Sequence, residues 1–280
     1  MSILGNPIIV ALNPNKLIPS FSYSGNYRFR YEELQDGTYN WELALLSGNN
    51  INLNFTQVTD KIDIFICGSG ADGTKGYSSQ TYSNYAYGGN GGNGGELKNL
   101  YNVSIAKNTN YAVKIGNHGE ITSITIGGTT YSCSSGGGKT GGAGAAVLGN
   151  AYGGTASAEN GKNGVIAFSD ATNSNNRDTK LLGWNGYRYG ASGGGGAAKN
   201  ALNIVRGNGS GGLGNVSGTA GGGAGGMWDS YGANGDGKNG VGNSGGGGGG
   251  GAYIQETYSY TDFPAGHGGS GIIIIRNHRS

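Results

Sequence analysis

Alternation of apolar and polar residues marks several β-strands along this chain. Apolar Ile51, Leu53 and Phe55 alternate with asparagines. Residues 111–115 repeat the same two-residue period, which is typical of a strand with one buried face. Residues 61–67 (KIDIFIC) are apolar at nearly every position, as expected of a strand covered on both faces. No stretch carries a sustained 3.6-residue period with capping residues, so the pattern predicts an all-β fold.

Further strands are expected where short apolar runs lie between turn residues. They are residues 40–46, 97–105, 121–126, 165–168 and 272–276. The last run contains four consecutive isoleucines, 272–275, and such a strand would promote aggregation if it were left exposed. We therefore expect it to pair with a strand from the first 135 residues, which would bring the first and last strands of one domain together.

Glycine divides the chain into two kinds of sequence. It accounts for 63 of the 280 residues, and 59 of these lie between positions 68 and 271. Glycine recurs there every third residue, as in the GGN repeats of residues 88–95 and at Gly245, Gly248 and Gly251. A three-residue period matches polyproline II, which has no internal hydrogen bonds. Buried N–H groups must then bond to neighbouring segments of the same kind, which glycine lets approach closely. The repeats predict laterally bonded polyglycine II rods.

These two kinds of sequence predict one composite domain over residues 39–280. Its fold class is all-β: a β-sandwich built from about 39–135 and 272–276, with an inserted glycine-rich polyglycine II helix bundle at about 136–271. At least three rods are expected in that insertion. Residues 1–38 are interpreted as an N-terminal attachment or assembly segment.

Composition excludes several classes of protein. The net charge is only +2 and 12% of residues are charged, which does not favour nucleic-acid binding through phosphate neutralisation. With only four prolines, the chain is not a collagen. The longest aliphatic run, 272–275, is far shorter than the ~20 residues of a membrane helix, so no membrane insertion is expected. The N-terminal residues lack the pattern of a secretory signal.

Cys67 and Cys133 are the two cysteines of the chain. Their spacing fits neither a zinc site nor a dense disulfide framework. Each lies in or beside an apolar strand pattern, which favours two buried, inert thiols. A single disulfide bond between them remains the alternative.

Four glycine motifs resemble catalytic or phosphate-binding signatures without the required context. Residues 68–73 spell GxGxxG and residues 136–140 resemble the end of a P-loop, but no helix pattern follows either. Residues 190–194 and 242–246 match GxSxG, yet both lie in low-complexity glycine without a strand-turn-helix pattern. Neither nucleotide binding nor nucleophilic catalysis is therefore expected.

The remaining candidate chemistry is sparse. His118, His267 and His278 are scattered, with no acid at metal or triad spacing. Asp229 and Asp236 lack the ligand spacing of a calcium loop. The prediction is therefore a protein that is not an enzyme, with no catalytic residues, no metal site and no cofactor.

Aromatic residues gather in four groups between the glycines. The groups are Tyr77, Tyr82, Tyr85 and Tyr87; Trp184, Tyr187, Arg188 and Tyr189; Trp228 and Tyr231; and Tyr253, Tyr258, Tyr260 and Phe263. Serine, asparagine and glycine surround them, a composition typical of binding surfaces. Loops that join rods would collect at the ends of the bundle. The alternative is that these rings cap the rods or fill gaps between the bundle and the sheet.

Three segments resemble a known family. Residues 62–73 (IDIFICGSGADG), 92–116 (ending in YAVKIG) and especially 268–279 (GGSGIIIIRNHR) are similar to glycine-rich proteins from tail and host-lysis regions of Gram-positive bacteriophages and prophages. The resemblance covers about residues 39–280. It implies a β-sandwich with a glycine-rich insertion, in a virion or a tail-like bacteriocin. Tail-tip adhesins of some Gram-negative phages likewise use polyglycine II bundles whose aromatic end loops contact the host.

The sequence therefore predicts a bacteriophage or tail-like-particle receptor-binding protein. Clustered aromatic residues with an arginine are the types that dominate interface energies. The residues expected to bind a bacterial surface polysaccharide or protein are Tyr82, Tyr85, Tyr87, Trp184, Tyr187, Arg188, Tyr189, Trp228 and Tyr231. Other tail or baseplate proteins, and two further copies in a homotrimer, are the other partners considered. The protein would be made in the host cytoplasm without a signal peptide and act in the virion tail.

Two other functions stay open. A structural tail or baseplate component would use the same loops to contact neighbouring subunits. An ice-binding protein would use flat faces of the glycine bundle, although the irregular spacing of asparagine and tyrosine argues against this.

Overall fold

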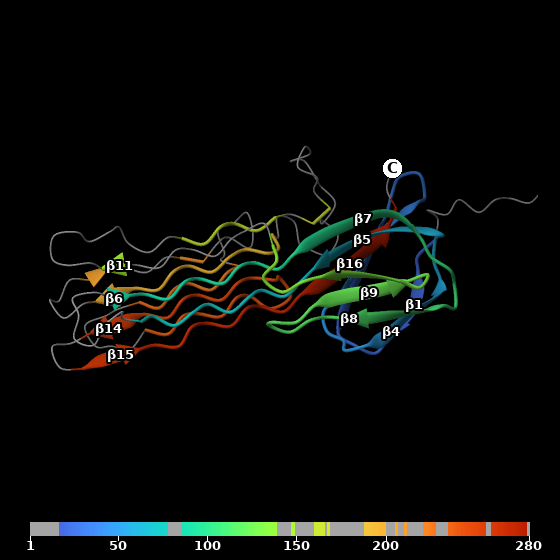
Figure 1. The fold of residues 1–280 in the computed structure, drawn as a ribbon. Helices are drawn as coiled ribbons and strands as arrows, with labels where there is room; N and C mark the ends of the chain where they lie inside the picture. Colours follow the sequence, from blue (N-terminus) through green and yellow to red (C-terminus); the bar gives the residue numbers. More distant parts are fainter. Residues whose placement is uncertain are drawn as a thin grey trace, which may run out of the picture.

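The protein is elongated, with two β-sheets at one end and a long glycine-rich bundle projecting from them (Figure 1). The computed structural model describes residues 17–77, 86–138, 147–148, 160–165, 167–168, 188–199, 205–206, 210–211, 221–227, 235–255 and 259–278. These residues form strands and no helix, so the all-β prediction is confirmed for them. No helix among them is long and apolar enough to span a membrane.

Two five-stranded sheets form the part that we call the two-sheet domain. The first sheet runs, in spatial order, through β2 (Tyr27–Glu33), β3 (Tyr39–Leu45), β16 (Ile272–Asn277), β5 (Lys61–Cys67) and β7 (Leu97–Ser104). The second runs through β1 (Ser20–Tyr23), β4 (Ile51–Gln57), β8 (Asn110–Lys114), β9 (Thr122–Ile126) and β10 (Thr129–Cys133).

One hydrophobic core lies between these sheets. In β4, Leu53 and Phe55 are buried while Asn52 is exposed, so the two-residue period of the sequence corresponds to a buried and a solvent-facing side. The core draws on both sheets, as with Leu43, Ile64 and Ile273 from the first and Leu53, Val113 and Ile124 from the second. Burial of these side chains is the main force that holds the sheets together.

The C-terminal strand β16 lies in the middle of the first sheet, between β3 and β5. Ile273 pairs with Leu45 of β3 and with Ile66 of β5, antiparallel in both cases. The expectation that the four isoleucines pair with strands of the first 135 residues is therefore confirmed. Ile273 and Ile275 face the core, whereas Ile272 and Ile274 belong to a second cluster, with Phe168 and Tyr189.

Strand β5 is covered on both faces, as its continuous apolar sequence predicts. Ile62, Ile64 and Ile66 lie in the core between the sheets. Phe65 and Cys67 lie in the second cluster, which Phe168 and Tyr189 of the glycine-rich part complete. The base of the glycine-rich part is thus packed against the outer face of the first sheet.

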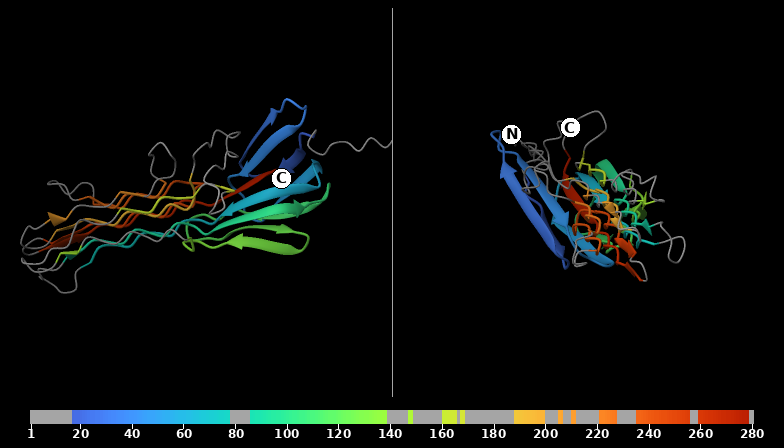
Figure 2. Two further views of the ribbon diagram at one scale, coloured as in Figure 1. Left: turned by 90° about the horizontal axis from the view of Figure 1, so that it is seen from above. Right: turned by 90° about the vertical axis from the view of Figure 1, so that its left-hand side faces the viewer.

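We name seven extended segments the glycine bundle: residues 68–77, 86–96, 188–199, 221–227, 235–241, 245–252 and 263–271. Viewed along their length they lie side by side (Figure 2, right). Residues 245–252, the central glycine segment, lie among the other six and are hydrogen-bonded to all of them.

The N–H groups of the central glycine segment point to three neighbours in turn, and the pattern repeats every third residue. The donors and acceptors are Gly247 to Ala191 (2.8 Å), Gly248 to Ala71 (2.9 Å), Gly249 to Lys238 (2.8 Å), Gly250 to Gly194 (2.9 Å), Gly251 to Thr74 (3.0 Å) and Ala252 to Gly235 (2.8 Å). The chain therefore turns by about a third of a revolution per residue.

The carbonyl groups of the same segment follow the same three-residue rule towards the other three neighbours. Gly245, Gly248 and Gly251 accept from Gly95, Gly92 and Gly89 of segment 86–96. Their sequence neighbours accept from 263–271 and from 221–227, as with Gly266 N–H to Gly249 O (2.8 Å) and Gly226 N–H to Gly250 O (2.8 Å). Every carbonyl and nearly every N–H of this buried segment is thus satisfied without a side chain.

Two bundle contacts continue the pairing of the sheet without a change of register. Cys67 of β5 pairs with Ile272 of β16, and further along the same two chains Gly70 N–H donates to Gly269 O and Gly73 N–H to Gly266 O. In an antiparallel ladder the hydrogen bonds to one neighbour recur every second residue, whereas Gly70 and Gly73 donate three residues apart. Segments 68–77 and 263–271 are therefore continuations of β5 and β16 in which the period of the hydrogen bonds changes.

The GGN repeats show how three-residue periodicity separates inside from outside. In residues 88–95 all glycines are buried and both asparagines, Asn90 and Asn93, are exposed. A Cβ atom on Gly91 would collide with the carbonyl group of Gly193, and one on Gly92 with that of Ala71. Side chains are therefore accommodated at one position in three, the one that faces solvent.

Two small sheets lie at the end of the bundle farthest from the two-sheet domain (Figure 1). One pairs β6 (Ala86–Tyr87) with β11 (Val147–Leu148). The other has the order β13 (Val205–Arg206), β12 (Ala198–Lys199), β14 (Tyr253–Gln255) and β15 (Tyr260–Asp262). We call this region the far end.

Segment boundaries differ from those expected in three places. Within residues 1–38, strand β1 pairs with β4 and strand β2 pairs with β3, so this segment contributes to both sheets.

The bundle begins at Gly68, not near 136, because the chain leaves β5 in line with the strand. The strand expected over 165–168 is wrong for the described positions: Val165 makes only an isolated bridge to Tyr189, and residues 167–168 form a turn.

Candidate functional site

A stacked pair of tyrosines marks the far end of the bundle. Tyr77 and Tyr87 exchange backbone hydrogen bonds of 2.8 and 2.9 Å. Their rings are nearly parallel, with centroids 4.8 Å apart and 9° between the planes. Tyr77 is 57% exposed, and its backbone is bonded to that of Tyr87, so an exposed ring is carried on a paired backbone.

A second tyrosine pair lies in the neighbouring small sheet. The rings of Tyr253 and Tyr260 stack with centroids 6.0 Å apart and an interplanar angle of 19°. Tyr253 is buried, whereas Tyr260 is 63% exposed. The buried ring supports the exposed one, so among the residues that the structure describes the far end carries two exposed tyrosines, each stacked on a second ring.

An ion pair spans two segments near these rings. Lys75 Nζ lies 3.8 Å from a carboxylate oxygen of Asp262, and both side chains are largely exposed. Such a pair contributes little to stability. The far end therefore combines aromatic rings and their hydroxyl groups with one positive and one negative side chain. This combination suits contact with a polar ligand.

The predicted receptor-binding residues do not lie in one place. Tyr87 is at the far end, whereas Arg188 and Tyr189 lie at the base of the bundle, where Gly190 N–H donates to Ser244 O. At ~3.1 Å per residue, segment 188–199 would span roughly 34 Å between the two ends. Tyr82, Tyr85, Trp184, Tyr187, Trp228 and Tyr231 lie outside the described residues.

Tyr189 is a core residue. It is 2% exposed, and its ring centroid lies 5.0 Å from that of Phe65. This ring fills the gap between the bundle and the first sheet, which was the alternative considered for the aromatic groups. Arg188 is partly buried beside it, and its guanidinium donates to Gly164 O (3.2 Å).

The glycine motifs at 68–73 and 190–194 serve close packing in the described structure. A Cβ atom on Gly70 would collide with the carbonyl of Gly246, and one on Gly193 with that of Gly248. Ser192, the serine of one GxSxG match, is fully buried and its hydroxyl accepts a hydrogen bond from Lys162 N–H (2.7 Å). Close packing explains the glycines of both motifs, and a structural hydrogen bond explains Ser192.

Both cysteines are buried and carry free thiols. Burial raises the pKa of Cys67 well above its usual value, and the nearby Cys133 raises it further. Burial likewise raises the pKa of Cys133 to about 12, with a contribution from the charge of Glu96. Protonated, enclosed thiols are poor nucleophiles, so the inert-thiol interpretation describes this structure.

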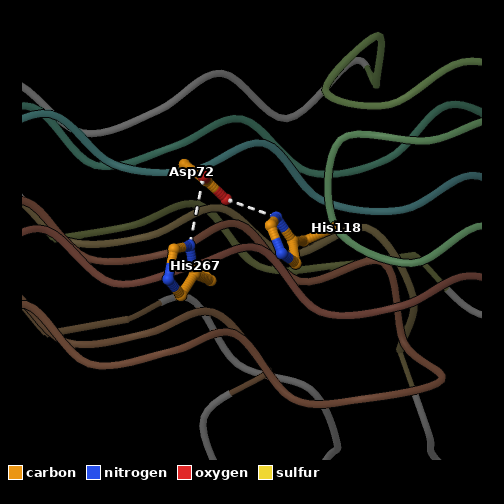
Figure 3. Close-up of side chains that lie close together, drawn as sticks. All are labelled: Asp72, His118 and His267. Carbon is orange, nitrogen blue, oxygen red and sulfur yellow. Dashed lines mark hydrogen bonds and ion pairs between the residues drawn. The ribbon is translucent and has the colours of Figure 1, made fainter.

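Among the described residues, three exposed side chains of metal-ligating type lie close together beside the turn between β8 and β9: those of Asp72, His118 and His267 (Figure 3). Nδ1 of His118 lies 3.5 Å from one oxygen of Asp72, and Nδ1 of His267 lies 3.2 Å from the other. The two imidazole rings are tilted by 31°, with centroids 4.6 Å apart. Three ligand-type groups thus converge from three elements.

The electrostatics of this cluster favour a charged carboxylate. Partial burial raises the pKa of Asp72, but the N–H of Gly268, the hydrogen bond from His267 and the two imidazoles together outweigh it, so the pKa lies below the usual 3.8. Spacing along the chain could not reveal this cluster, because its members are 46 and 149 residues apart in sequence. The register between segments 68–77 and 263–271 brings Asp72 and His267 together, and the turn between β8 and β9 adds His118.

A second carboxylate with basic partners is buried inside the first sheet. Asp63 is fully buried and accepts from Arg276 Nε (3.1 Å) and from Asn102 N–H (3.0 Å), while His278 Nδ1 lies 2.7 Å from it. The guanidinium of Arg276 also lies over the ring of Phe168, 4.0 Å from its centroid. These groups fasten the C-terminal strand in the sheet.

The chain matches no protein-family model and no curated protein sequence.

Proposed function

We propose that this protein is a receptor-binding adhesin of a bacteriophage or tail-like particle, which holds aromatic groups against a bacterial surface at the far end of a stiff glycine bundle. The observation that carries the proposal is the placement of the two stacked tyrosine pairs. Tyr77 and Tyr260 are exposed at the end farthest from the two-sheet domain.

The architecture that we propose for this role is a β-sandwich carrying a polyglycine II bundle. The hydrogen bonds of the central glycine segment support it, because they reach six neighbours with a period of three residues. Gly246 to Gly251 are also absent from the residues of positive φ, as a left-handed three-residue helix at φ near −75° requires. Such a bundle would be stiff, since bending it would strain lateral bonds on every side.

The receptor-binding surface that we propose combines described and undescribed residues. Tyr77, Tyr87 and Tyr260 are its described part. Segments 78–85 and 228–234 are flanked by described residues of the far end, so Tyr82, Tyr85, Trp228 and Tyr231 are proposed to act with them. Trp184 and Tyr187 precede Arg188 and Tyr189 in sequence, and those two lie at the base of the bundle, so the surface proposed at the far end does not include these four residues.

The partners proposed are a bacterial surface polysaccharide or protein at the far end and tail or baseplate proteins at the two-sheet domain. Aromatic faces bind sugar rings and protein side chains alike, because both offer C–H groups to a π-face. Several copies on one particle, as in a homotrimer, would raise a weak single-site affinity. In this proposal the protein is not an enzyme and acts outside the cell as part of the virion tail.

The test is binding of the labelled full chain to a panel of Gram-positive cells. We expect saturable binding to some strains, weakened about tenfold or more by the double substitution Tyr77→Ala/Tyr87→Ala, since an interface hot spot contributes on the order of 2 kcal/mol. Tyr31→Ala is the matched control, because Tyr31 is 53% exposed on β2, away from the far end.

A structural tail or baseplate component is the second candidate, and the burial of Tyr189 and Tyr253 favours it for those rings. It predicts no binding to any strain, or binding that Tyr31→Ala weakens as much as the far-end variant. Either result would overturn the adhesin proposal. Saturable binding lost only in the far-end variant would exclude a purely structural role.

A further inference from the structure

We propose that Asp72, His118 and His267 form a binding site for a divalent transition metal ion. The inference rests on the convergence of one carboxylate and two imidazoles on the surface at the base of the bundle (Figure 3). It does not depend on host binding, because none of the three residues belongs to the tyrosine pairs of the far end.

The spacing of the ligand atoms fits a tetrahedral site. Zinc–nitrogen and zinc–oxygen bonds of ~2.0–2.2 Å place neighbouring ligand atoms roughly 3.3–3.5 Å apart. The two imidazole Nδ1 atoms lie 3.5 and 3.2 Å from oxygens of Asp72. All three ligand atoms lie within 4.8 Å of one another, so small rotations of exposed side chains complete the set.

The backbone positions these ligands. Gly268 N–H donates to Asp72 Oδ1 (2.9 Å), and the N–H of His267 donates to Asn239 Oδ1 (2.8 Å). Backbone hydrogen bonds between segments 68–77 and 263–271 hold Asp72 and His267 opposite each other. His118 comes from the turn between β8 and β9, in the two-sheet domain.

The donor set selects the class of metal. Two imidazole nitrogens and one carboxylate suit Zn²⁺, Ni²⁺ or Cu²⁺, whereas Ca²⁺ and Mg²⁺ prefer sites made of oxygen alone. The three side chains are 45–61% exposed, which leaves a fourth position open to water or to a ligand from another molecule. A bound ion would join two bundle segments to the two-sheet domain and fix the base of the bundle.

The test is calorimetric titration of the full chain, without a histidine tag, with Zn²⁺. We expect one ion per chain and a rise in the melting temperature on zinc addition, because an ion that binds only the folded state stabilises it. His118→Gln, His267→Gln and Asp72→Asn should each weaken binding at least about tenfold, the lower limit seen when even an indirect partner of a metal is removed. Their exposure makes normal folding of these variants the expectation, and circular dichroism checks it.

His278→Gln is the matched control, because it removes an imidazole that contacts Asp63 and lies away from the site. Co²⁺ provides a second readout, since a tetrahedral Co²⁺ complex absorbs strongly in the visible range and the three variants should lose that absorption. Absence of zinc binding at millimolar concentration would overturn the proposal. Binding that His278→Gln weakens, or that the three site variants leave unchanged, would also overturn it.

Discussion

The two-sheet domain and the glycine bundle bury their chains by different physical means. In the domain, strands bond to two neighbours and large side chains such as Phe55 and Ile273 fill the space between layers. In the bundle, the central glycine segment bonds to six neighbours and has no side chain larger than a methyl group. One region is held by apolar area, the other by backbone hydrogen bonds and close approach.

This difference determines which substitutions each region tolerates. A side chain of the domain core can be exchanged for another of similar volume at modest cost. In the central glycine segment no side chain fits at Gly247, Gly248 or Gly249, because a Cβ atom at each of them meets a carbonyl group of a neighbour. On the outside of the bundle, positions such as Asn90 and Asn93 face solvent. The central segment therefore excludes side chains at three successive positions, whereas the outer segment 88–95 excludes them at two positions in three.

The largest effect is expected from Gly248→Val. The new side chain would collide with the backbone of Gly266 and His267, and would disrupt about six lateral hydrogen bonds of residues 247–249, each contributing a net ~0.5–1.5 kcal/mol. With the strain of overpacking, ~1–3 kcal/mol, the loss of unfolding free energy should be on the order of 5 kcal/mol or more. Urea unfolding followed by circular dichroism measures it.

Lys238→Ala is the control for that substitution. Lys238 is an exposed residue of a neighbouring segment, and truncation of its side chain leaves the backbone bond from Gly249 to Lys238 O in place. Its effect should stay within about 0.5 kcal/mol. If Gly248→Val were as stable as this control, close packing of glycine could not be what holds the bundle together.

The next effect concerns buried charge, which the domain contains and the central glycine segment does not. Asp63→Ala removes a fully buried carboxylate that Arg276, His278 and Asn102 contact. Breaking a buried ion pair from one side costs ~3–5 kcal/mol, and thermal unfolding should show the loss. Asp262→Ala breaks the exposed pair with Lys75 and should cost under about 1 kcal/mol. Equal losses would remove this contrast between the regions.

Local patterns predicted much of the fold. The two-residue period identified β4 and β8, the continuous apolar runs identified β5 and β16, and the three-residue period marked residues 88–95 as glycine that neighbouring segments approach closely. The edge strand β2 was missed although Tyr27, Phe29 and Tyr31 alternate there with charged residues, because both of its faces are largely exposed and its apolar signal is weak.

What depends on register between distant segments could not be predicted. The order of the segments around 245–252, and the meeting of Asp72, His118 and His267, follow from hydrogen bonds between residues far apart in sequence. The position of the Tyr189 ring could not be predicted for the same reason. Trp184, Tyr187 and Arg188 precede it, a composition typical of a binding loop, but the packing of the bundle on the first sheet places the ring in the core.

A smaller change in unfolding free energy is expected when one methyl group is removed from the domain core or added to the bundle. Ile273→Val removes one carbon from a fully buried side chain of the core and should lower the unfolding free energy by ~0.5–1.5 kcal/mol. Gly249→Ala adds one carbon against the carbonyl of Ala224 and should cost more than this. Chemical denaturation of the two variants compares them, and a larger loss for Ile273→Val would contradict the exclusion of side chains from the central glycine segment.

The smallest effect lies where the two regions join. Glu96 ends segment 86–96, and one of its carboxylate oxygens accepts from the N–H (2.8 Å) and the hydroxyl (2.9 Å) of Ser134. The N–H of Ser134 is the main cause that lowers the pKa of Glu96 below the usual 4.5, against the opposing effect of partial burial, with help from the Ser134 hydroxyl and Lys98.

Because the folded-state pKa lies below the unfolded one, the charged carboxylate stabilises the fold above about pH 4.5 and this contribution is lost as the pH falls through the folded-state pKa. Glu96→Gln should therefore cost under about 1 kcal/mol at neutral pH, since the group is well exposed to solvent. The difference from the unsubstituted chain should shrink towards zero in acid. Urea unfolding of both proteins at neutral pH and near pH 3 measures it, and a difference that persists or grows in acid would show that the charge of Glu96 does not stabilise the junction.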